Sequence, residues 1–302
     1  MEIADVLKEY AHGGLVRAFD HVAPHILESA REMRIRQGLP IIVRTLSDEV
    51  VLAYKPTMAD IAGTLAKMAN HSLYAYDAEI KNGFISLVGG HRVGICGRAV
   101  VEGGKIKTLR HISGLTIRIA RQVIGAGDAV LPFVAVKGQG RPNNTLIISP
   151  PGQGKTTVLR DLVRILSNKK LHVAVVDERS EIGGTQLGIT QNDLGIRTDV
   201  LDGAPKAEGM LLVLRAMSPD VIAVDEIGGD EDVKALLAVS SCGAKIIATL
   251  HGENMADLQR KQSLAPLLTN GIFDRYIFLT DKPKPATLRA VYDKDFREIK
   301  LC

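Results

Sequence analysis

Short apolar blocks alternate with longer amphipathic stretches in the second half of the chain. The apolar blocks are Thr145–Ser149, His172–Val176, Val221–Val224 and Ile246–Leu250, and the stretches with helical periodicity are Thr156–Leu166, a region after Pro205 and Glu231–Ser241. Continuous apolar blocks of this length are typical of strands that are buried on both faces. Strands that alternate with helices predict βαβ crossovers, so we expect an α/β fold with a mainly parallel sheet.

The first part of the chain has a different pattern. An initial helical region is interrupted by Pro24 and by Gly38-Leu39-Pro40. Further elements are strands over Ile41–Arg44, Val50–Ala53, Phe84–Val88, Arg92–Val101 and Leu115–Ala120, and a helix that opens at Asp60. The glycine pairs between the later strands suit tight turns because glycine adopts positive φ. We therefore predict a smaller α+β domain over residues 1–122, ahead of the α/β domain.

The boundary between the two domains is expected at the Gly125–Asp128 break, which gives a second domain over residues 123–302. Asp128 is in a position to cap a short helix over Leu131–Val136. The sequence thus divides into an N-terminal α+β domain and a larger α/β domain.

Composition narrows the class of protein. The chain has 302 residues, of which 46% are hydrophobic and 24% charged, and its net charge of +4 includes no long run of like charges, so we expect a globular protein without a basic nucleic-acid arm. Cys96, Cys242 and Cys302 lie far apart and fit neither a zinc site nor a disulfide framework, which indicates a reducing compartment. Since every apolar block is shorter than the roughly 20 residues that span a bilayer, we expect any membrane role to be peripheral.

A phosphate-binding loop is predicted at the end of the first apolar block. The sequence from Ser149 to Thr156 matches G-x-x-x-x-G-K-[ST], except that serine replaces the first glycine. Its glycines allow the backbone N–H groups to surround phosphate oxygens at the start of a helix. The predicted ATP-binding residues are Pro150, Pro151, Gly152, Gln153, Gly154, Lys155, Thr156 and Thr157. The alternative is a glycine-rich turn with an incidental lysine.

Within this loop, two side chains have predicted roles. We expect the Lys155 ammonium to reach the β- and γ-phosphates and the Thr156 hydroxyl to bind Mg²⁺. Asp225 follows the block Val221–Val224 and is the predicted carboxylate on the metal side. Glu226, the next residue, is the candidate general base for the attacking water.

A second acidic cluster follows the block His172–Val176. It reads Asp177-Glu178-Arg179-Ser180-Glu181, and its Glu178 competes with Glu226 for the role of base. Because this cluster falls between the two motifs in the chain, we expect its strand to lie between the phosphate-loop strand and the Asp225 strand. At the end of the last apolar block, Thr249 or His251 is a candidate sensor of the γ-phosphate, although an isolated histidine is more often structural.

Taken in order, these motifs resemble the Walker A, Asp box, Walker B and His box of the type II/type IV secretion ATPases. Gly89–Arg98 and Leu115–Arg121 extend the resemblance upstream, toward the stage III AA proteins of sporulation, so that it spans nearly the whole chain. The resemblance implies a RecA-like P-loop domain, ATP and Mg²⁺ as ligands, and an ATP-hydrolysing motor. It also implies a hexamer in the cytoplasm, docked peripherally on membrane channel proteins of the sporulation septum, which it would power or assemble during endospore formation.

In these relatives, arginines of the N-terminal domain complete a nucleotide site. Arg98, Arg118 and Arg121 occupy comparable strand segments, so the resemblance implies that one or more of them acts in trans on the transferring phosphoryl group. Two features depart from the family pattern. The chain lacks the four-cysteine zinc element, and its Asp box reads Asp-Glu-Arg where many relatives have Glu-Asp-Pro.

Three other functions stay open on sequence grounds. An ATPase that acts on single-stranded nucleic acid is the main alternative. With six Phe, six Tyr and no Trp, the chain has few aromatic side chains on which nucleobases could stack, so we expect no nucleic-acid partner. A GTP-binding switch would need an Asn-Lys-x-Asp motif, and Asn168-Lys169-Lys170-Leu171 lacks the aspartate. A scaffold that does not hydrolyse ATP would tolerate Lys155→Ala.

Overall fold

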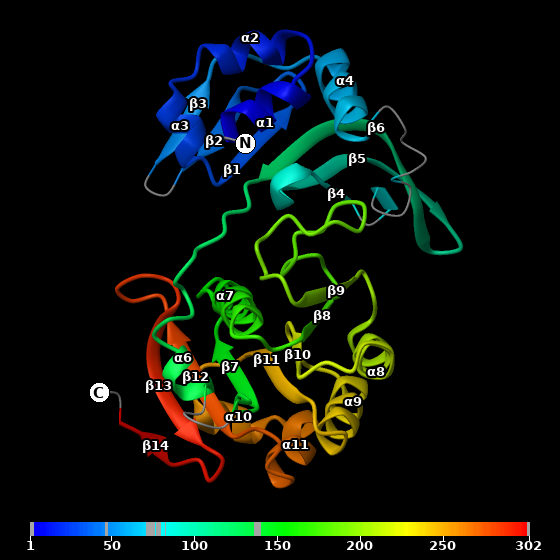
Figure 1. Ribbon diagram of the computed structural model, residues 1–302. Helices are drawn as coiled ribbons and strands as arrows, with labels where there is room; N and C mark the ends of the chain where they lie inside the picture. Colours follow the sequence, from blue (N-terminus) through cyan, green and yellow to red (C-terminus); the bar gives the residue numbers. More distant parts are fainter. Residues whose placement is uncertain are drawn as a thin grey trace. The chain divides into compact units, whose positions relative to one another are not determined.

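The computed structural model describes residues 3–45, 48–70, 76, 80–81, 83–135 and 140–300. The chain divides into two compact units, Met1–Arg121 (unit 1) and Gln122–Cys302 (unit 2), each of which has its own core (Figure 1). In the part of the chain that the structure describes, none of the helices combines the length and the apolar character that crossing a bilayer requires.

Unit 1 is an antiparallel sheet covered by helices. The sheet has the order β3-β2-β1-β6-β5-β4. Its strands are β1 (Glu32–Arg36), β2 (Ile41–Arg44), β3 (Glu49–Leu52), β4 (Phe84–Ser86), β5 (Arg92–Glu102) and β6 (Lys105–Arg118), and its α-helices are α1 (Ile3–Tyr10), α2 (Gly14–Asp20), α3 (Pro24–Ser29) and α4 (Met58–Met68), with a 3₁₀ turn, η2, over Val88–Gly90. Alternate strand residues such as Met33, Ile117 and Val93 face the helices and are fully buried. Unit 1 is therefore a two-layer α+β structure.

Several details of unit 1 differ from the sequence prediction. The strand β1 was expected to be helical, because its alternation is short and lies between proline-containing segments. Pro24 begins α3 at its first turn, where proline needs no N–H partner. Thr57, three residues before Asp60, is the N-cap of α4, and the two side chains form a capping box.

Unit 2 is built on an eight-stranded sheet with the order β14-β13-β12-β7-β11-β10-β8-β9. The strands are β7 (Thr145–Ser149), β8 (Val173–Asp177), β9 (Thr198–Asp202), β10 (Val221–Val224), β11 (Lys245–His251), β12 (Arg275–Thr280), β13 (Thr287–Asp293) and β14 (Glu298–Ile299). The six strands from β12 to β9 are mutually parallel, and β13 and β14 continue the sheet in antiparallel pairing. The predicted mainly parallel α/β sheet is therefore confirmed.

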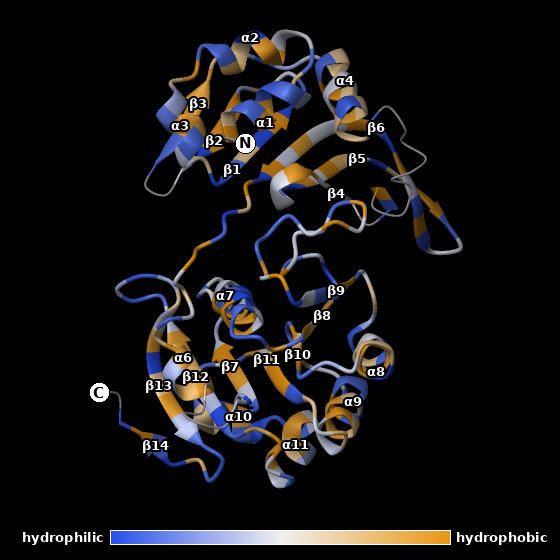
Figure 2. Cartoon of the chain, in the orientation of Figure 1, coloured by the Kyte–Doolittle hydropathy of each residue, from blue (hydrophilic) through white to orange (hydrophobic). Residues whose placement is uncertain are grey.

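Helices cover both faces of this sheet. The helices are α6 (Leu131–Val134), α7 (Lys155–Asn168), α8 (Lys206–Met217), α9 (Asp230–Ser241), α10 (Met255–Arg260) and α11 (Ala265–Thr269), with a 3₁₀ turn, η3, over Gln262–Leu264. One core joins α6 and α7 to residues such as Ile147 and Ala223, and the other joins α8 to α11 to residues such as Ile148 and Val224. Burial on both faces explains the continuous apolar strands, which form the hydrophobic centre in Figure 2.

The strand order corrects one prediction. The strand β8 does not lie between β7 and β10; β11 does, and β8 lies on the far side of β10. Chain order misled the prediction because a parallel crossover can return to either side of its starting strand. The short helix predicted over Leu131–Val136 is observed over Leu131–Val134 without a side-chain cap, so Asp128 is not its cap. Val136 lies outside the described residues.

Candidate functional site

The phosphate-loop candidate connects the end of β7 to the start of α7. Gly152 and Gly154 have φ of 76° and 93°, values that favour glycine. A side chain at Gly154 would also come within 2.8 Å of the Ala286 backbone nitrogen, which donates a 2.9 Å hydrogen bond to the Gln153 carbonyl. The loop therefore needs glycine at 154 for two reasons, its backbone angle and its close approach to a neighbouring turn. Pro150, Pro151 and Thr157 complete the segment, which precedes and enters α7.

Lys155 is buried at the first position of α7. Its Nζ donates to the carbonyls of Ser149 (2.9 Å) and Pro150 (3.1 Å) and lies 2.9 Å from Nδ1 of His251. Burial lowers the pKa of Lys155, and the carboxylates of Asp225 and Glu226 oppose that shift. An ammonium group held among carbonyls at the start of a helix is placed to bind an anion that enters the loop.

Thr156 and Asp225 bring their oxygens together beside the loop. The Thr156 hydroxyl donates to Oδ2 of Asp225 over 3.0 Å. The other oxygen of Asp225 accepts from the Thr249 hydroxyl and from the backbone N–H of Glu226 (2.9 Å). Asp225 is therefore fixed on one side by protein donors and presents its second oxygen to Thr156.

These two oxygens fit magnesium. Among the described residues, no three His, Cys, Asp or Glu side chains gather closely enough to hold a metal by themselves. Mg²⁺ commonly uses one or two protein oxygens together with substrate phosphates and water. Thr156 and Asp225, next to the candidate phosphate loop, are such a partial set of hard oxygen ligands.

Glu226 sits in a strained position at the end of β10. Its φ of 35° is unusual for a residue with a side chain, and its N–H is held by Asp225 and by Thr249 Oγ1 (2.9 Å). Its carboxylate lies 3.2 Å from Nε2 of His251 and 3.5 Å from Nη1 of Arg179. The buried strand end thus fixes the backbone while the half-exposed carboxylate faces two potential donors.

His251 links the lysine to the carboxylate. The Lys155 ammonium has donors only, so in this contact Nδ1 of His251 accepts and Nε2–H is left to donate to Glu226. His251 lies at the end of β11, beside the strand of Asp225, as the sequence predicted. The backbone carbonyl of His251 accepts a hydrogen bond from Lys261.

The acidic residues Asp177, at the end of β8, and Glu178, which follows it, have separate surroundings. Asp177 is buried, and burial raises its pKa to about 6 despite three backbone N–H donors. Glu178 is exposed and pairs with Lys206. Of the two candidate bases, Glu226 contacts the histidine of the site, whereas Glu178 faces a lysine on α8.

The three candidate trans arginines all belong to unit 1. Arg98 lies opposite Arg110 in the β5–β6 hairpin, and Arg118, at the end of β6, is 3.8 Å from Glu32. Arg121 lies beyond the strand, where its guanidinium donates to the carbonyls of Glu28 and Ala30. Only two of the three therefore occupy strands, because β6 ends at Arg118.

Three residues near the site were not assigned from the sequence. Arg160 donates to the carbonyls that follow Asp177, Lys261 holds the turn after β11, and Arg179 pairs with Glu226. Thr249, which the sequence offered beside His251 as a sensor of the γ-phosphate, donates to Asp225. The other contacts depend on loop conformation, which carries no periodic signal.

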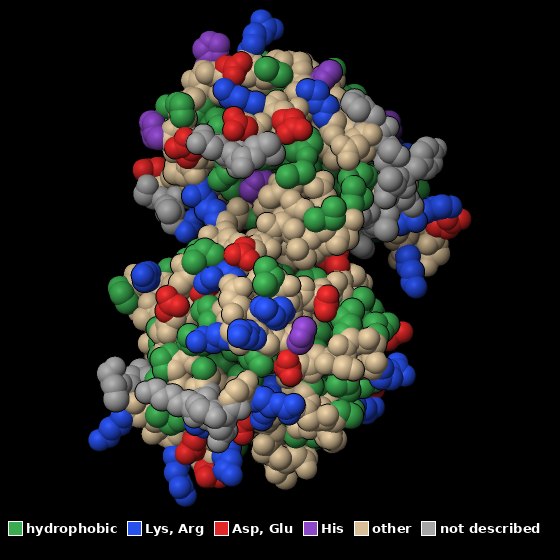
Figure 3. All heavy atoms as spheres, viewed as in Figure 1, with side chains coloured by type: hydrophobic (Ala, Val, Ile, Leu, Met, Phe, Trp, Pro, Cys, Tyr) green, Lys and Arg blue, Asp and Glu red, His purple; other side chains and the backbone are tan. Residues whose placement is uncertain are grey.

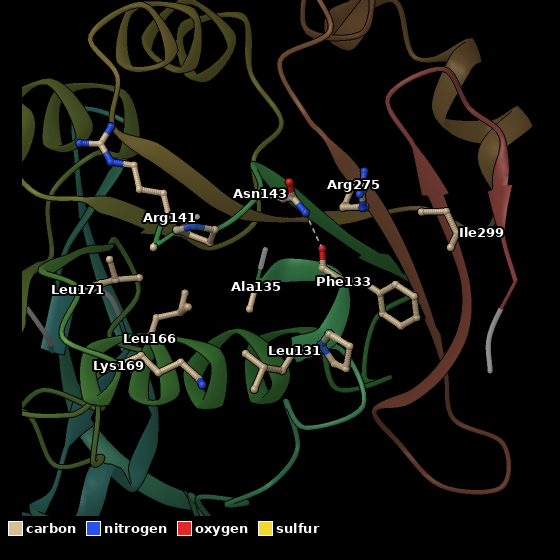
Figure 4. Close-up of a pocket in the computed structure, with 13 residues that line it drawn as sticks. Leu131, Phe133, Ala135, Arg141, Asn143, Leu166, Lys169, Leu171, Arg275 and Ile299 are labelled. Atoms are coloured by element: carbon tan, nitrogen blue, oxygen red, sulfur yellow. Dashed lines mark hydrogen bonds between the residues drawn. The ribbon is translucent and has the colours of Figure 1, made fainter. Parts of the chain in front are cut away.

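A pocket lies at the amino ends of the parallel strands, away from the candidate phosphate loop at their carboxyl ends. Its volume is about 790 Å³, and its lining includes Leu131, Phe133, Leu166, Lys169 and Arg275 (Figure 4). Asn143, which also lines it, donates from its amide to the Phe133 carbonyl (2.8 Å). None of the predicted site residues lines this pocket, so pocket size and the predicted chemistry point to different edges of the same sheet.

Comparison with known proteins gives relatives at two levels of similarity. Stage III sporulation protein AA of Bacillus subtilis is 41% identical over 299 residues, which cover 97% of this chain and 95% of that protein. The protein named ycf45 of Cyanidium caldarium is 30% identical over 160 residues, or 52% of this chain and 46% of its own.

Solved structures show the fold. The Legionella pneumophila ATPase DotB matches with a TM-score of 0.55 at 17% identity, over 82% of this chain and 72% of its own. The pilus retraction motor PilT with bound ADP matches with a TM-score of 0.56 at 15% identity, over 92% and 78%. The predicted RecA-like fold of the secretion ATPases, preceded by a smaller α+β part, is confirmed.

The family model described as "Sporulation stage III, protein AA" matches residues 10–299, which is nearly the whole chain. Together with the full-length similarity to the Bacillus subtilis protein, this match settles membership. The chain belongs to the stage III sporulation protein AA family.

Proposed function

We propose that the protein is a magnesium-dependent ATPase that works as a motor during endospore formation. The observation that carries this proposal is the convergence of two contact networks on one loop. Lys155, His251 and Glu226 form the first network, and Thr156, Asp225 and Thr249 form the second. The first offers a cation and a base for phosphate chemistry, and the second offers oxygens for a metal.

Each protein group has a distinct part in the proposed reaction. A water oxygen attacks the γ-phosphorus, its proton passes to the Glu226 carboxylate, and the bond between the γ-phosphorus and the bridging oxygen breaks. ADP leaves with the electron pair of that bond, and inorganic phosphate is the second product. Lys155 neutralises charge on the phosphates, and the N–H groups of Gly152–Thr156 bind their oxygens.

Water has room beside the base. A cavity of about 190 Å³ is lined by Glu226, His251, Lys261 and neighbouring residues. A volume of this size holds several waters, each of which takes about 30 Å³ in the liquid. Magnesium, when bound by Thr156 and Asp225 with the nucleotide, would supply further neutralisation of phosphate charge.

The motor role is proposed from the family and the fold. The chain belongs to a sporulation family and has the fold of DotB and of a pilus retraction motor. We propose that it acts as a hexamer at the cytoplasmic side of a membrane channel of the sporulation septum, which it powers or assembles through contacts with channel proteins. In the hexamer, Arg98, Arg118 or Arg121 would reach a neighbouring copy's nucleotide.

The test is phosphate release from Mg-ATP by the purified protein, with Lys155→Ala as the inactive control. We expect multiple turnovers by the wild type and a rate at least about 10²-fold lower by the variant. Single-stranded DNA is added in a parallel series, because strong stimulation would favour the nucleic-acid alternative over the secretion motor. Basic and acidic side chains both occur on the face seen in Figure 3. A folded wild type with no turnover would contradict the proposal.

A further inference from the structure

Arg179 stands on a turn that the protein holds rigidly. The Asp177 carboxylate, at the end of β8, accepts the backbone N–H groups of Glu181 (2.8 Å), Ile182 (3.0 Å) and Gly183 (2.7 Å). The turn therefore closes around a buried carboxylate, and Arg179 lies inside the closed segment. The position of its backbone relative to β8 is fixed.

Two further contacts brace the same turn. Ser180 adopts a φ of 54°, and its hydroxyl donates to Asp202 over 2.6 Å. Arg160, from α7, donates to the carbonyls of Ile182 (2.9 Å) and Glu181 (2.5 Å). Since α7 begins in the phosphate loop, the turn that carries Arg179 is tied to the helix that carries Lys155.

The Arg179 side chain is free to exchange partners. It is 60% exposed, and its contact with Glu226 at 3.5 Å is a long ion pair between partly solvated groups. Pairs of this kind are weak, because water screens the charges. Glu178, the adjacent acidic residue, is paired with Lys206 instead. Arg179 is thus drawn toward the site and is not held there tightly.

A continuous line of contacts leads from Arg179 to the phosphate loop. Arg179 contacts Glu226, Glu226 contacts His251 (3.2 Å), and His251 contacts the Lys155 ammonium (2.9 Å). Two cations therefore stand at the ends of a line of contacts that includes the proposed base. A phosphoryl group that reacts beside Glu226 would have Arg179 as a neighbouring cation in addition to Lys155.

We propose that Arg179 is an arginine that stabilises the transferring phosphoryl group in cis, within the chain that binds the nucleotide, in addition to the arginine proposed to act in trans. The inference rests on the proposed ATPase function and identifies a further residue of that site. In the hydrolysis described above, the guanidinium changes no covalent bond. It leaves Glu226 and neutralises the negative charge that moves onto the leaving oxygen of ADP.

The chemistry of this side chain suits the proposed role, because arginine stays protonated and keeps its positive charge. The planar guanidinium suits phosphate oxygens, which it can bind through two N–H groups at once.

The first experiment measures steady-state ATP turnover and Mg-ATP affinity for Arg179→Ala, Arg179→Lys and the control Arg215→Ala. Arg215 is an exposed arginine of unit 2 whose guanidinium donates to a carbonyl of its own helix. We expect kcat to fall about 10³-fold in Arg179→Ala, with partial recovery in Arg179→Lys, while the affinity for Mg-ATP changes less than about threefold. Thermal unfolding of all variants checks that they are folded.

The second experiment separates cis from trans by mixing chains. Arg179→Ala and Lys155→Ala proteins are combined in equal amounts after exchange of subunits, and turnover is compared with the sum of the separate proteins. If Arg179 acts in cis, every site in the mixture carries one defect, so no turnover is recovered. The pairs Arg98→Ala, Arg118→Ala or Arg121→Ala with Lys155→Ala serve as the matched trans comparison.

Each result decides the inference. Loss of turnover in Arg179→Ala without recovery on mixing supports the cis role, and so does the same loss in a protein that stays monomeric. Three results would overturn it: recovery of turnover on mixing, unchanged turnover in Arg179→Ala, or a rise in turnover in that variant. A rise would show that Arg179 restrains Glu226. A wild type that does not hydrolyse ATP would instead refute the ATPase proposal on which the inference rests.

Discussion

The two ends of helix α7 lie near opposite ends of the parallel strands of unit 2, and their surroundings differ. At the amino end, Lys155 is 6% exposed and bonded to carbonyls and a histidine. At the carboxyl end, Lys169 is exposed and lines a pocket whose walls are mainly apolar (Figure 4). At the amino end of α7 a charged side chain is buried among specific hydrogen-bond partners. At its carboxyl end there is a pocket whose described residues form no comparable group of bonded charges.

The difference teaches that the proposed site is distinguished by its network of charged groups and not by its cavity volume. Burying an ammonium or a carboxylate is unfavourable unless hydrogen bonds and opposite charges compensate. The carboxyl edge of the sheet holds such compensated groups at the ends of β7, β8, β10 and β11. In open parallel sheets this edge is where ligands bind.

The largest expected effect separates the two candidate bases. Glu226→Gln removes the proton acceptor while keeping the shape, so kcat should fall by about 10²–10⁴-fold with Mg-ATP binding retained. Glu178→Gln should lose less, because Glu178 faces Lys206. Phosphate release measured under saturating ATP checks both. Full activity of Glu226→Gln would remove it from the role of base.

The second effect compares the ends of α7 directly. Lys155→Ala should lower kcat/KM by at least about 10²-fold, because one preorganised donor to the phosphates is lost. Lys169→Ala, at the C-cap of the same helix, should leave kcat and KM within about twofold. Equal losses in the two variants would contradict the assignment of chemistry to the carboxyl edge.

The third effect concerns pH and the buried carboxyl of Asp177. Burial raises its pKa to about 6, with a further contribution from Asp202, whereas the unfolded chain has the ordinary value of 3.8. Between these two values the folded protein keeps a proton that the unfolded chain releases, so the free energy of unfolding should fall as pH rises from about 4 to about 6.

The expected decrease is on the order of 3 kcal/mol, and denaturant unfolding at several pH values measures it. Asp177→Asn should flatten this part of the profile, at some cost in stability since an acceptor is lost. Asp60 does not interfere, because hydrogen bonds from Thr57 and others outweigh its burial and lower its pKa to about 2, below this window. An unchanged slope in Asp177→Asn would contradict the assignment.

The smallest effect tests the support of the metal-side carboxylate. Thr249→Val removes the hydroxyl that donates to Asp225 and accepts from the Glu226 N–H. We expect the magnesium concentration that gives half-maximal turnover to rise about tenfold, as is typical when a partner of a metal ligand is lost. Thr249→Ser keeps the hydroxyl and should stay near the wild type. Equal behaviour of the two variants would count against this role.

The parallel core of unit 2 was predictable because burial on both faces leaves continuous apolar strands. The strands β9, β12, β13 and β14 were not predicted. Of these, β9 and β14 lie at the two edges of the sheet, and β13 carries mixed polarity. Strand order was also beyond the sequence, because a crossover can place β8 on either side of β10. In unit 1, β1 is too short for its alternation to be distinguished from a helix end.

For the site, the sequence predicted the residues whose chemistry is tied to a fixed spacing. The loop Gly152–Thr156 and Asp225 belong to that class, and the structure brings Thr156 and Asp225 into contact. Contacts such as that of Arg179 with Glu226 depend on how the turn after β8 folds. That turn is set by a buried carboxylate and three backbone donors, which no spacing rule specifies.

Calorimetric titration of the folded wild type with ATP, with and without magnesium, tests the central claim most directly. The claim is that the loop between β7 and α7 binds a nucleoside triphosphate whose magnesium is shared with Asp225. We expect one nucleotide bound per chain in the presence of magnesium and much weaker binding when the metal is chelated. Absence of magnesium-dependent binding at every protein concentration, by material shown to be folded, would contradict the account.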